Sequence, residues 1–196
     1  FTFVPNSMVY SEQLVVFASA AASVYAVLQS SIHSSWVHQY ASSLKGDTRY
    51  TPSDCFGTFP MPKNSRETVE HAGDDCCKFR RELMVAREEG LTAIYNRFHN
   101  PDDRAIDMSR LRDLHVEMDT VVAASYGWDD LALDHGFHET RRGARFTISD
   151  IDRREVLRRL LEMNHRRYQG EVAAGLHSKG HDKQTGRQDG ADEDED

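Results

Sequence analysis

The hydrophobic pattern divides the chain into two parts. In residues 1–62 apolar side chains are dense, whereas from residue 63 to residue 177 the chain is rich in Arg, Glu and Asp and its apolar residues return with helical spacing. The pattern predicts an α+β chain, with a mixed unit over residues 1–63 and a helical bundle carrying a small β-hairpin over residues 64–177. The charged residues of the first part are Glu12, Lys45, Asp47, Arg49 and Asp54.

Residues 8–17, MVYSEQLVVF, are rich in β-branched and aromatic residues, which predicts a strand. A helix is then expected to begin at Ser19 or Ser23, because apolar residues recur three or four positions apart as far as Tyr40. Residues 45–48 predict a turn. Three prolines in residues 49–62, RYTPSDCFGTFPMP, argue against a helix and predict an extended, irregular chain.

Beyond residue 63 an amphipathic helix is predicted over residues 79–98, ending before Asn100-Pro101. A second helix carries the apolar residues between Leu111 and Tyr126, and Gly127 is its expected stop. Residues 137–148 change to β character around Arg141-Arg142-Gly143, which favours a short hairpin. Ser149, with Asp152 three residues later, resembles a capping box and predicts a last helix that reaches Tyr168.

The net charge of −8 is concentrated at the end of the sequence. Residues 189–196 hold six acids and no base, so that residues 1–188 carry 26 acids against 24 bases and are close to neutral. Residues 178–196 contain no large apolar side chain, which predicts a disordered acidic tail. Of the 24 bases 19 are arginine, which suits phosphate and guanine contacts or reflects a GC-rich genome.

Composition also narrows the class of protein and its compartment. A mean hydropathy of −0.64 indicates a soluble protein, and the apolar stretch over residues 14–28 is too short and too rich in Ala and Ser to span a membrane. Three cysteines, two of them adjacent, fit neither a disulfide framework nor a CxxC metal site, and favour a cytoplasmic protein. The first residue, Phe1, opens an apolar run, which is typical of a fragment.

Several short motifs occur in an order that carries a family resemblance. The chain resembles the carboxy-terminal target-recognition and helical region of large bacterial class I DNA adenine methyltransferases, a group that includes fused type IIG restriction-modification enzymes and phage-defence methyltransferases. The motifs before residue 63 are SSIHSSW at residues 30–36, RYTPSDCF at 49–56 and TFPMP at 58–62, and those after it are EGLT at 89–92, YNRFH at 95–99, YGW at 126–128 and GFHET at 136–140.

The resemblance implies that residues 1–63 are the end of a target-recognition domain and residues 64–177 a helical domain. Family members transfer a methyl group from S-adenosylmethionine, using an upstream domain with a glycine-rich cofactor loop and an Asn/Asp-Pro-Pro-aromatic motif. Neither motif is present here, because no two of the 12 glycines are two residues apart and Asn100-Pro101 continues as Asp102-Asp103. A PD-(D/E)xK nuclease is unsupported as well, since none of the five lysines follows an acid two positions earlier.

We therefore expect this chain to hold no catalytic residue and no cofactor, with S-adenosylmethionine bound by the upstream domain. The expected partners are double-stranded DNA and that upstream domain of the same polypeptide, and no membrane. The function that follows is recognition and clamping of DNA, so that a catalytic domain outside this chain can flip and methylate an adenine. The alternative is a non-catalytic helical module of a defence system that binds another protein, which the near-neutral charge favours.

The candidate DNA-binding residues lie on two predicted turns and on the chain after the first turn. Arginine, serine and threonine contact phosphates and base edges, although a proline-rich linker or a solvated hairpin tip would have a similar composition. The candidates are Lys45, Arg49, Tyr50, Thr51, Ser53, Arg141 and Arg142.

No metal site is predicted. His135 and His138 lie close to several acids, but a zinc site needs three or four ligands at defined spacing. His33 and His38 are five residues apart and do not share a helix face. Phe56, Phe59 and Met61 are expected in the core.

Overall fold

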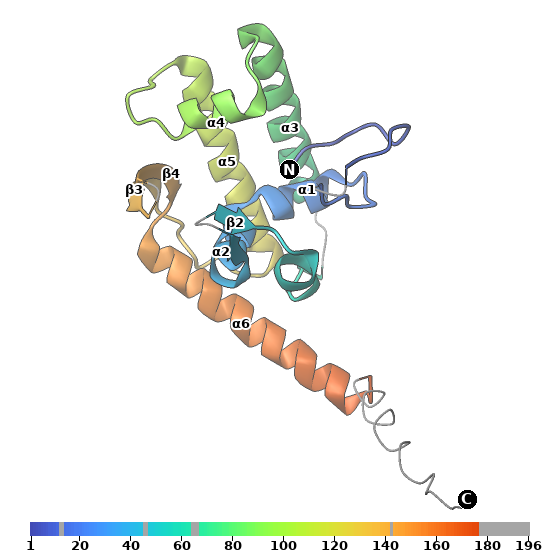
Figure 1. Ribbon diagram of the computed structural model, residues 1–196. Coiled ribbons are helices and arrows are strands. Elements are labelled where there is room, and N and C mark those ends of the chain that lie inside the picture. Colours follow the sequence, from blue (N-terminus) through green and yellow to red (C-terminus); the bar gives the residue numbers. More distant parts are fainter. Residues whose placement is uncertain (12–13, 45–46, 64–66, 142, 177–196) are drawn as a thin grey trace, which may run out of the picture.

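The computed structural model describes residues 1–11, 14–44, 47–63, 67–141 and 143–176 (Figure 1). The fold is α+β, as predicted, with helices and two separate antiparallel hairpins. The predicted acidic tail, residues 178–196, lies outside the described residues. In chain order the elements are α1 (Ala22–Gln29), α2 (Ser31–Tyr40), β1 (Ser42–Leu44), β2 (Asp47–Arg49), the π-helical turn η1 (Ser53–Gly57), α3 (Glu67–Arg87), α4 (Leu91–Phe98), α5 (Ile106–Ser125), β3 (His135–Thr140), β4 (Gly143–Ile148) and α6 (Asp150–Ala173).

The predicted strand over residues 8–17 is wrong. The described residues of this segment form an irregular loop (Figure 1), and Met8, Val9 and Val16 are 60%, 100% and 59% exposed. β propensity records how well a side chain packs on a neighbouring strand, and among the described residues no strand pairs with this segment. This segment therefore has the composition of a strand, but among the described residues no neighbouring strand hydrogen-bonds to it.

The helix predicted to run to Tyr40 is two helices, because Ser30 adopts an extended conformation between α1 and α2 (φ −65°, ψ 157°). The Ser30 hydroxyl donates to the Val27 carbonyl at 2.7 Å and accepts from the His33 amide at 3.2 Å. One serine thus ends the first helix and caps the second.

The prediction of an irregular chain over residues 49–62 is wrong at η1. Pro52 precedes this turn with φ −55° and ψ −39°, and a proline lacks only an amide that is unsatisfied at the start of a helix. The Cys55 amide donates to the Thr51 carbonyl at 2.8 Å. Phe59 is 3% exposed, which confirms its expected place in the core.

The helix predicted over residues 79–98 is interrupted. Glu88 has φ 52°, so the chain turns after α3, and Gly90 caps α4. The other elements predicted after residue 63 are confirmed. Gly127, at φ 76°, follows α5, and the Ser149 hydroxyl accepts from the Asp152 amide at the start of α6. The β3–β4 hairpin is antiparallel, with Gly143 at its turn.

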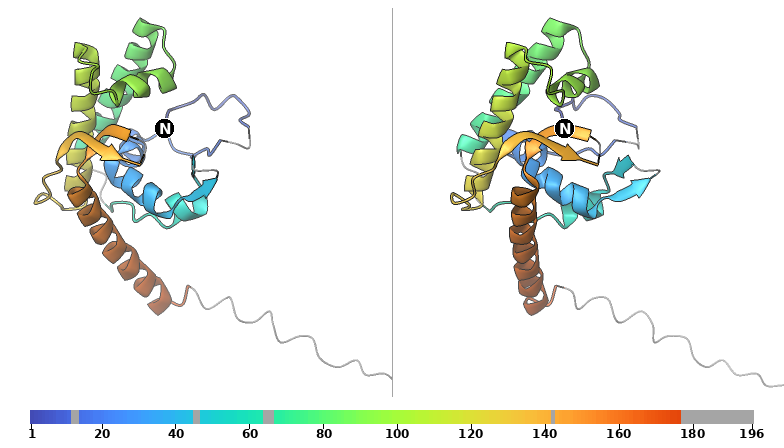
Figure 2. Two further views of the ribbon diagram at one scale, coloured as in Figure 1. Left: turned by 60° about the vertical axis from the view of Figure 1, so that its left-hand side comes forward. Right: turned by 90° about the vertical axis from the view of Figure 1, so that its left-hand side faces the viewer.

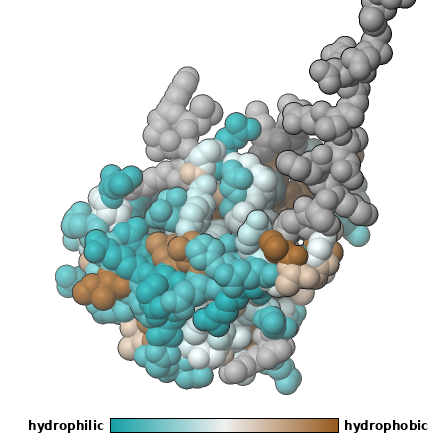
Figure 3. All heavy atoms as spheres, turned by 90° about the horizontal axis from the view of Figure 1, so that it is seen from below, coloured by the Kyte–Doolittle hydropathy of each residue, from teal (hydrophilic) through white to brown (hydrophobic). Residues whose placement is uncertain are grey.

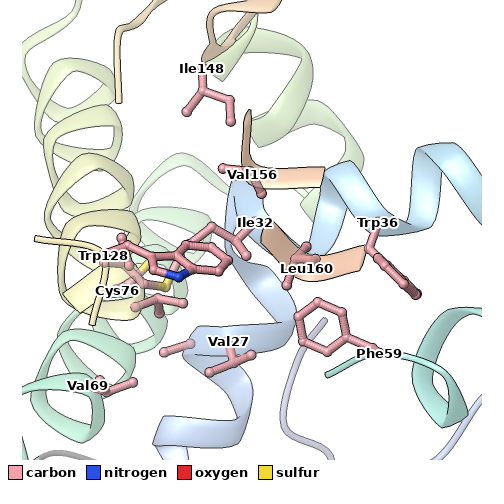
Figure 4. Close-up of a cluster of buried hydrophobic side chains, with 14 of the residues drawn as sticks. Val27, Ile32, Trp36, Phe59, Val69, Cys76, Trp128, Ile148, Val156 and Leu160 are labelled. Atoms are coloured by element: carbon pink, nitrogen blue, oxygen red, sulfur yellow. The ribbon is translucent and has the colours of Figure 1, made fainter. Parts of the chain in front are cut away.

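A shared hydrophobic core joins the two parts of the sequence (Figure 4). α1 packs on α3 and α5, and α2 packs on α6, so that side chains from before and after residue 63 are buried together. A smaller cluster fills the space between α3, α4 and α5. The larger core includes Val27, Ile32, Trp36, Phe59, Val69, Cys76, Trp128, Ile148, Val156 and Leu160.

One face of the molecule is largely polar. The face in Figure 3 is covered mainly by hydrophilic side chains, with small, separate apolar spots. α6 extends away from the rest of the molecule (Figures 1 and 2). Within the described ranges every helix is too short or too polar to span a lipid bilayer.

Candidate nucleic-acid interface

The two hairpins lie on the same side of the molecule. In the right-hand view of Figure 2 the strands of β1–β2 and of β3–β4 both lie on the right of the helices, where the N-terminal loop also lies. These hairpins belong to segments far apart in the sequence, and each carries candidate DNA-binding residues. The fold therefore places the two sets on the same side of the molecule.

Arg49 ends the first hairpin. It pairs with Ser42 across the two strands, and its side chain is exposed. Among the described residues no carboxylate lies within ion-pair distance of its guanidinium. Lys45 lies outside the described residues.

Tyr50 anchors the hairpin to the core. Its hydroxyl lies 3.1 Å from Nε2 of His33, a residue with no exposed surface, and its ring meets the ring of Phe1 edge-on at 5.7 Å. Burial lowers the pKa of His33 to about 3, so this imidazole is neutral, and burial raises the pKa of Tyr50 above its ordinary value. Tyr50 is half-buried with its hydroxyl engaged, and it fixes the chain directly after Arg49.

Thr51 and Ser53 organise the start of η1. The Thr51 carbonyl accepts from the amides of Asp54 and Cys55, and its hydroxyl lies 3.4 Å from that of Ser42. The exposed Ser53 hydroxyl donates to the Asp54 carboxylate at 2.9 Å. Both hydroxyls thus have partners within the chain, and of the two side chains only Ser53 is exposed.

The second hairpin carries Arg141, which is exposed at the turn between β3 and β4. Its neighbour Arg142 lies outside the described residues. Within the described ranges Arg141 has no ion pair, and the same is true of Arg104 and Arg145. Arg145 lies close enough to His99 to contribute, after burial, to lowering the pKa of that histidine to about 4.

Arg112 of α5 packs against aromatic rings of the second hairpin, a role that nothing in its local sequence indicates. The guanidinium is 5.0 Å from the ring of Phe137 on β3 and 5.9 Å from that of Phe146 on β4. It also donates to carbonyls at the end of α4 and in the α4–α5 connection at 2.8–3.1 Å, while only 7% of the residue is exposed. The Arg112 guanidinium is therefore occupied by hydrogen bonds and ring contacts within the protein.

The arginines of α6 differ from those of the hairpins because they are paired with acids. Arg158 binds Glu155 on the same helix at 2.7 Å, and Arg159 binds Asp130, which precedes β3, at 2.6 Å. These pairs leave α6 with few free cations. Among the described residues, the exposed arginines without an ion pair include Arg49 and Arg141 at the two hairpins, Arg104 on a loop and Arg81 on α3.

The histidines and cysteines indicate structural roles. His135 contacts Asp119, whereas Nε2 of His138 contacts the Asp134 carbonyl at 3.0 Å, so the two histidines do not converge. Among the described residues no group of three His, Cys, Asp or Glu side chains is arranged to hold a metal ion. Cys76 is buried, and burial raises its pKa to about 11, which keeps the thiol protonated.

Comparison with known proteins assigns a class to the N-terminal third of this architecture. Residues 1–63 match the family model described as MmeI, target recognition domain. "DNA methyltransferase A" from Bacillus subtilis (strain 168) is 28% identical over 118 residues, which cover 60% of this chain and 12% of that protein. The match thus spans about an eighth of that relative's length. No solved structure matches the chain. These matches confirm the resemblance to the recognition region of a type II restriction-modification methyltransferase.

Proposed function

We propose that this chain is the DNA-recognition and DNA-clamping part of a site-specific DNA adenine-N6 methyltransferase. Double-stranded DNA binds across the side on which both hairpins lie. The observation that carries this proposal is the match of residues 1–63 to a target recognition domain, because these residues include α1, α2 and the β1–β2 hairpin.

The geometry of the hairpins supports DNA contact. A two-stranded β-ribbon fits the major groove of B-form DNA, and arginine binds either a phosphate or the O6 and N7 atoms of guanine. Arg49 and Arg141 are exposed, lack ion pairs in the described chain and lie on hairpins anchored from within by Tyr50 and Arg112. Because the backbone of each hairpin is already anchored, an arginine on it loses less conformational freedom when it binds DNA.

Catalysis and cofactor binding belong, in this proposal, to a domain outside residues 1–196. The described glycines with positive φ support this division, because Gly127 follows α5, Gly143 forms the β3–β4 turn and Gly175 follows α6. A glycine loop for a dinucleotide-like cofactor lies instead between a strand and the helix after it. The chain contributes the positioning of the DNA, and the catalytic domain flips and methylates the adenine.

A second candidate is a non-catalytic module that binds another protein of a defence system. The observation that favours it is the exposed apolar loop near the N-terminus, where Val9 is 100% and Leu14 59% exposed. The two functions differ in salt dependence. Phosphate contacts give DNA affinity a steep negative dependence on salt concentration, and an apolar protein contact does not.

The test of DNA recognition is Arg49→Ala in the full-length protein. If Arg49 contacts a guanine, we expect the preference at one base position to relax, at a cost of about 1–3 kcal/mol. If it contacts a phosphate, all sequences should bind less tightly and the slope of log affinity against log salt should fall by about one unit. Site preference is measured by sequencing methylated DNA, and affinity by titration at two or more salt concentrations.

The matched control is Arg166→Ala, which removes the same charge from the exposed surface of α6, away from both hairpins. This variant should retain the parental site preference and salt slope. A folded Arg49→Ala protein with unchanged site preference and salt slope would place the DNA elsewhere on the molecule.

A further inference from the structure

Asp119 lies at a junction between the two hairpin-bearing segments. Its side chain is only 1% exposed, and both carboxylate oxygens are used. Oδ1 accepts from the backbone amide of Ser31 at 2.8 Å, and Oδ2 lies 2.8 Å from Nε2 of His135. Ser31 is the first residue of α2, and His135 is the first residue of β3. One carboxylate on α5 therefore holds the beginnings of two elements that are distant in sequence.

The His135 side of this junction is a buried contact between an imidazole ring and a carboxylate. Nδ1 of the ring lies 3.1 Å from the Leu133 carbonyl, while Nε2 faces Asp119. A carbonyl and a carboxylate both accept hydrogen bonds, so each ring nitrogen that carries a proton has an acceptor within reach. The His135 side chain is 7% exposed, and removing it would leave a buried Asp119 oxygen without its hydrogen-bond partner.

Both partners of Asp119 belong to elements that precede or form a hairpin. α2 ends at Tyr40, and β1 begins at Ser42, so the position of α2 determines where the β1–β2 hairpin and Arg49 lie. β3 is one strand of the hairpin that carries Arg141. A shift at Asp119 would therefore change the placement of one hairpin relative to the other.

We propose that Asp119 is a positioning residue for DNA recognition, which fixes the two hairpins relative to each other through Ser31 and His135. The inference rests on the proposed function. Asp119 does not touch DNA, because it is buried under α2 and β3. Its effect on site preference comes from keeping the two sets of free arginines at one spacing along the duplex.

The experiment is Asp119→Asn in the full-length protein, read out by amide hydrogen exchange and by DNA site preference. The asparagine retains an oxygen for the Ser31 amide but removes the charge that faces His135. We expect exchange in the first turn of α2 and in the β3–β4 hairpin to increase together, by about ten-fold or more, and the site preference to relax. If this variant does not fold, His135→Gln breaks the same link from the side of β3.

Two controls separate positioning from general destabilisation. Leu111→Ala lowers stability from the same helix but from the second hydrophobic cluster, which reaches β4 through Phe146, and should not raise the exchange of the first turn of α2 together with that of the β3–β4 hairpin. Asp113→Asn removes a charge from an exposed position of α5 and should behave as the parent.

The outcomes distinguish this inference from the proposed function. If the wild-type protein shows no sequence-specific DNA binding, the proposed function and the role of Asp119 in specificity are both overturned. The exchange data would still decide whether Asp119 couples α2 to the β3–β4 hairpin. If Asp119→Asn loosens only one of them, or changes exchange and site preference no more than Leu111→Ala does, the positioning role is overturned.

Discussion

Three buried or half-buried histidines make the stability of this protein sensitive to mild acid. Burial lowers the pKa of His33 to about 3, and burial is also the largest cause that lowers the pKa of His99 and His115 to about 4. In an unfolded chain a histidine has a pKa of about 6.5. Between these values the unfolded state binds protons that the folded state does not.

The expected result is a loss of stability as the pH falls from about 6.5 toward 4, with the full contribution of these residues present above that window. Each histidine adds up to about 1.4 kcal/mol per pH unit to the slope of the unfolding free energy. Urea unfolding at a series of pH values measures this slope. His115→Gln, which keeps a polar group near the Tyr95 hydroxyl, should reduce the slope by the share of one histidine.

Retention of the full parental slope in His115→Gln would show that His115 takes up its proton equally in both states. The contribution of the histidines to stability is lost in a different pH window from that of Glu70. The pKa of the Glu70 carboxyl is lowered mainly by hydrogen bonds from Ser23. Glu70 contributes stability that is present above its unfolded pKa of about 4.3 and is lost only below it.

At the scale of elements, α1 is attached to α3 by a close and polar contact. Ala21, which precedes α1, has no side chain able to cap it, and the Glu70 carboxylate of α3 accepts from the amides of Ala22 and Ser23 at 2.8 Å each. Gly73, one turn further along α3, is buried against the same end of α1. The absence of a side chain at Gly73 lets the two backbones approach.

Gly73→Ala should therefore separate α1 from α3. The new Cβ would lie 2.2 Å from the Ala22 carbonyl oxygen and 2.9 Å from its carbon, so the backbone has to shift. We expect a destabilisation of at least about 1–3 kcal/mol, as for other overpacked sites, measured by chemical or thermal unfolding.

Gly90→Ala is the matched control, because its Cβ would meet nothing within 4 Å and its φ of −73° suits an alanine. Equal stability of the two variants would mean that α1 and α3 adjust without cost, and that the close approach does not hold them together.

At the scale of the whole molecule, elements from both parts of the sequence hold the residues that match the target recognition domain model. α6 contributes to this support, since Nδ2 of Asn164 donates to the Thr58 carbonyl at 2.6 Å, and Arg167 donates to the Met61 carbonyl. The segments before and after residue 63 share one core. Separating them would therefore expose apolar surface on both.

We expect the isolated chain to have no methyltransferase activity, because it lacks the cofactor loop and the catalytic motif. The measurement is transfer of labelled methyl groups from S-adenosylmethionine to unmethylated genomic DNA, with the full-length protein as the positive control. Transfer by residues 1–196 above the background without protein would contradict the assignment of catalysis to another domain.

The candidate site could be predicted from the sequence only to a limited extent. Arg49 and Arg141 are exposed on hairpins, but Tyr50 is a half-buried anchor, and Lys45 and Arg142 lie outside the described residues. His33, Arg112 and Asp119 were missed, and their local sequence carries no signal of their roles. Whether any of these side chains contacts DNA remains a prediction.

What the sequence determined by itself was local. The β3–β4 hairpin, the end of α5 before Gly127 and the Ser149 cap of α6 follow from turn and capping chemistry within a few residues, and all are present. The α+β class follows from the change of hydrophobic period along the chain. Such features need no information about distant segments of the chain.

What only the tertiary structure decided depends on partners that are distant in sequence. The segment around Met8 has strand propensity, but in the described chain no strand pairs with it, and a buried carboxylate reaches the start of α2 from 88 residues away. Packing also brings the two hairpins to one side (Figure 2). Burial and long-range hydrogen bonds have no periodicity that a sequence pattern can carry, because they arise when separate elements dock around a common core.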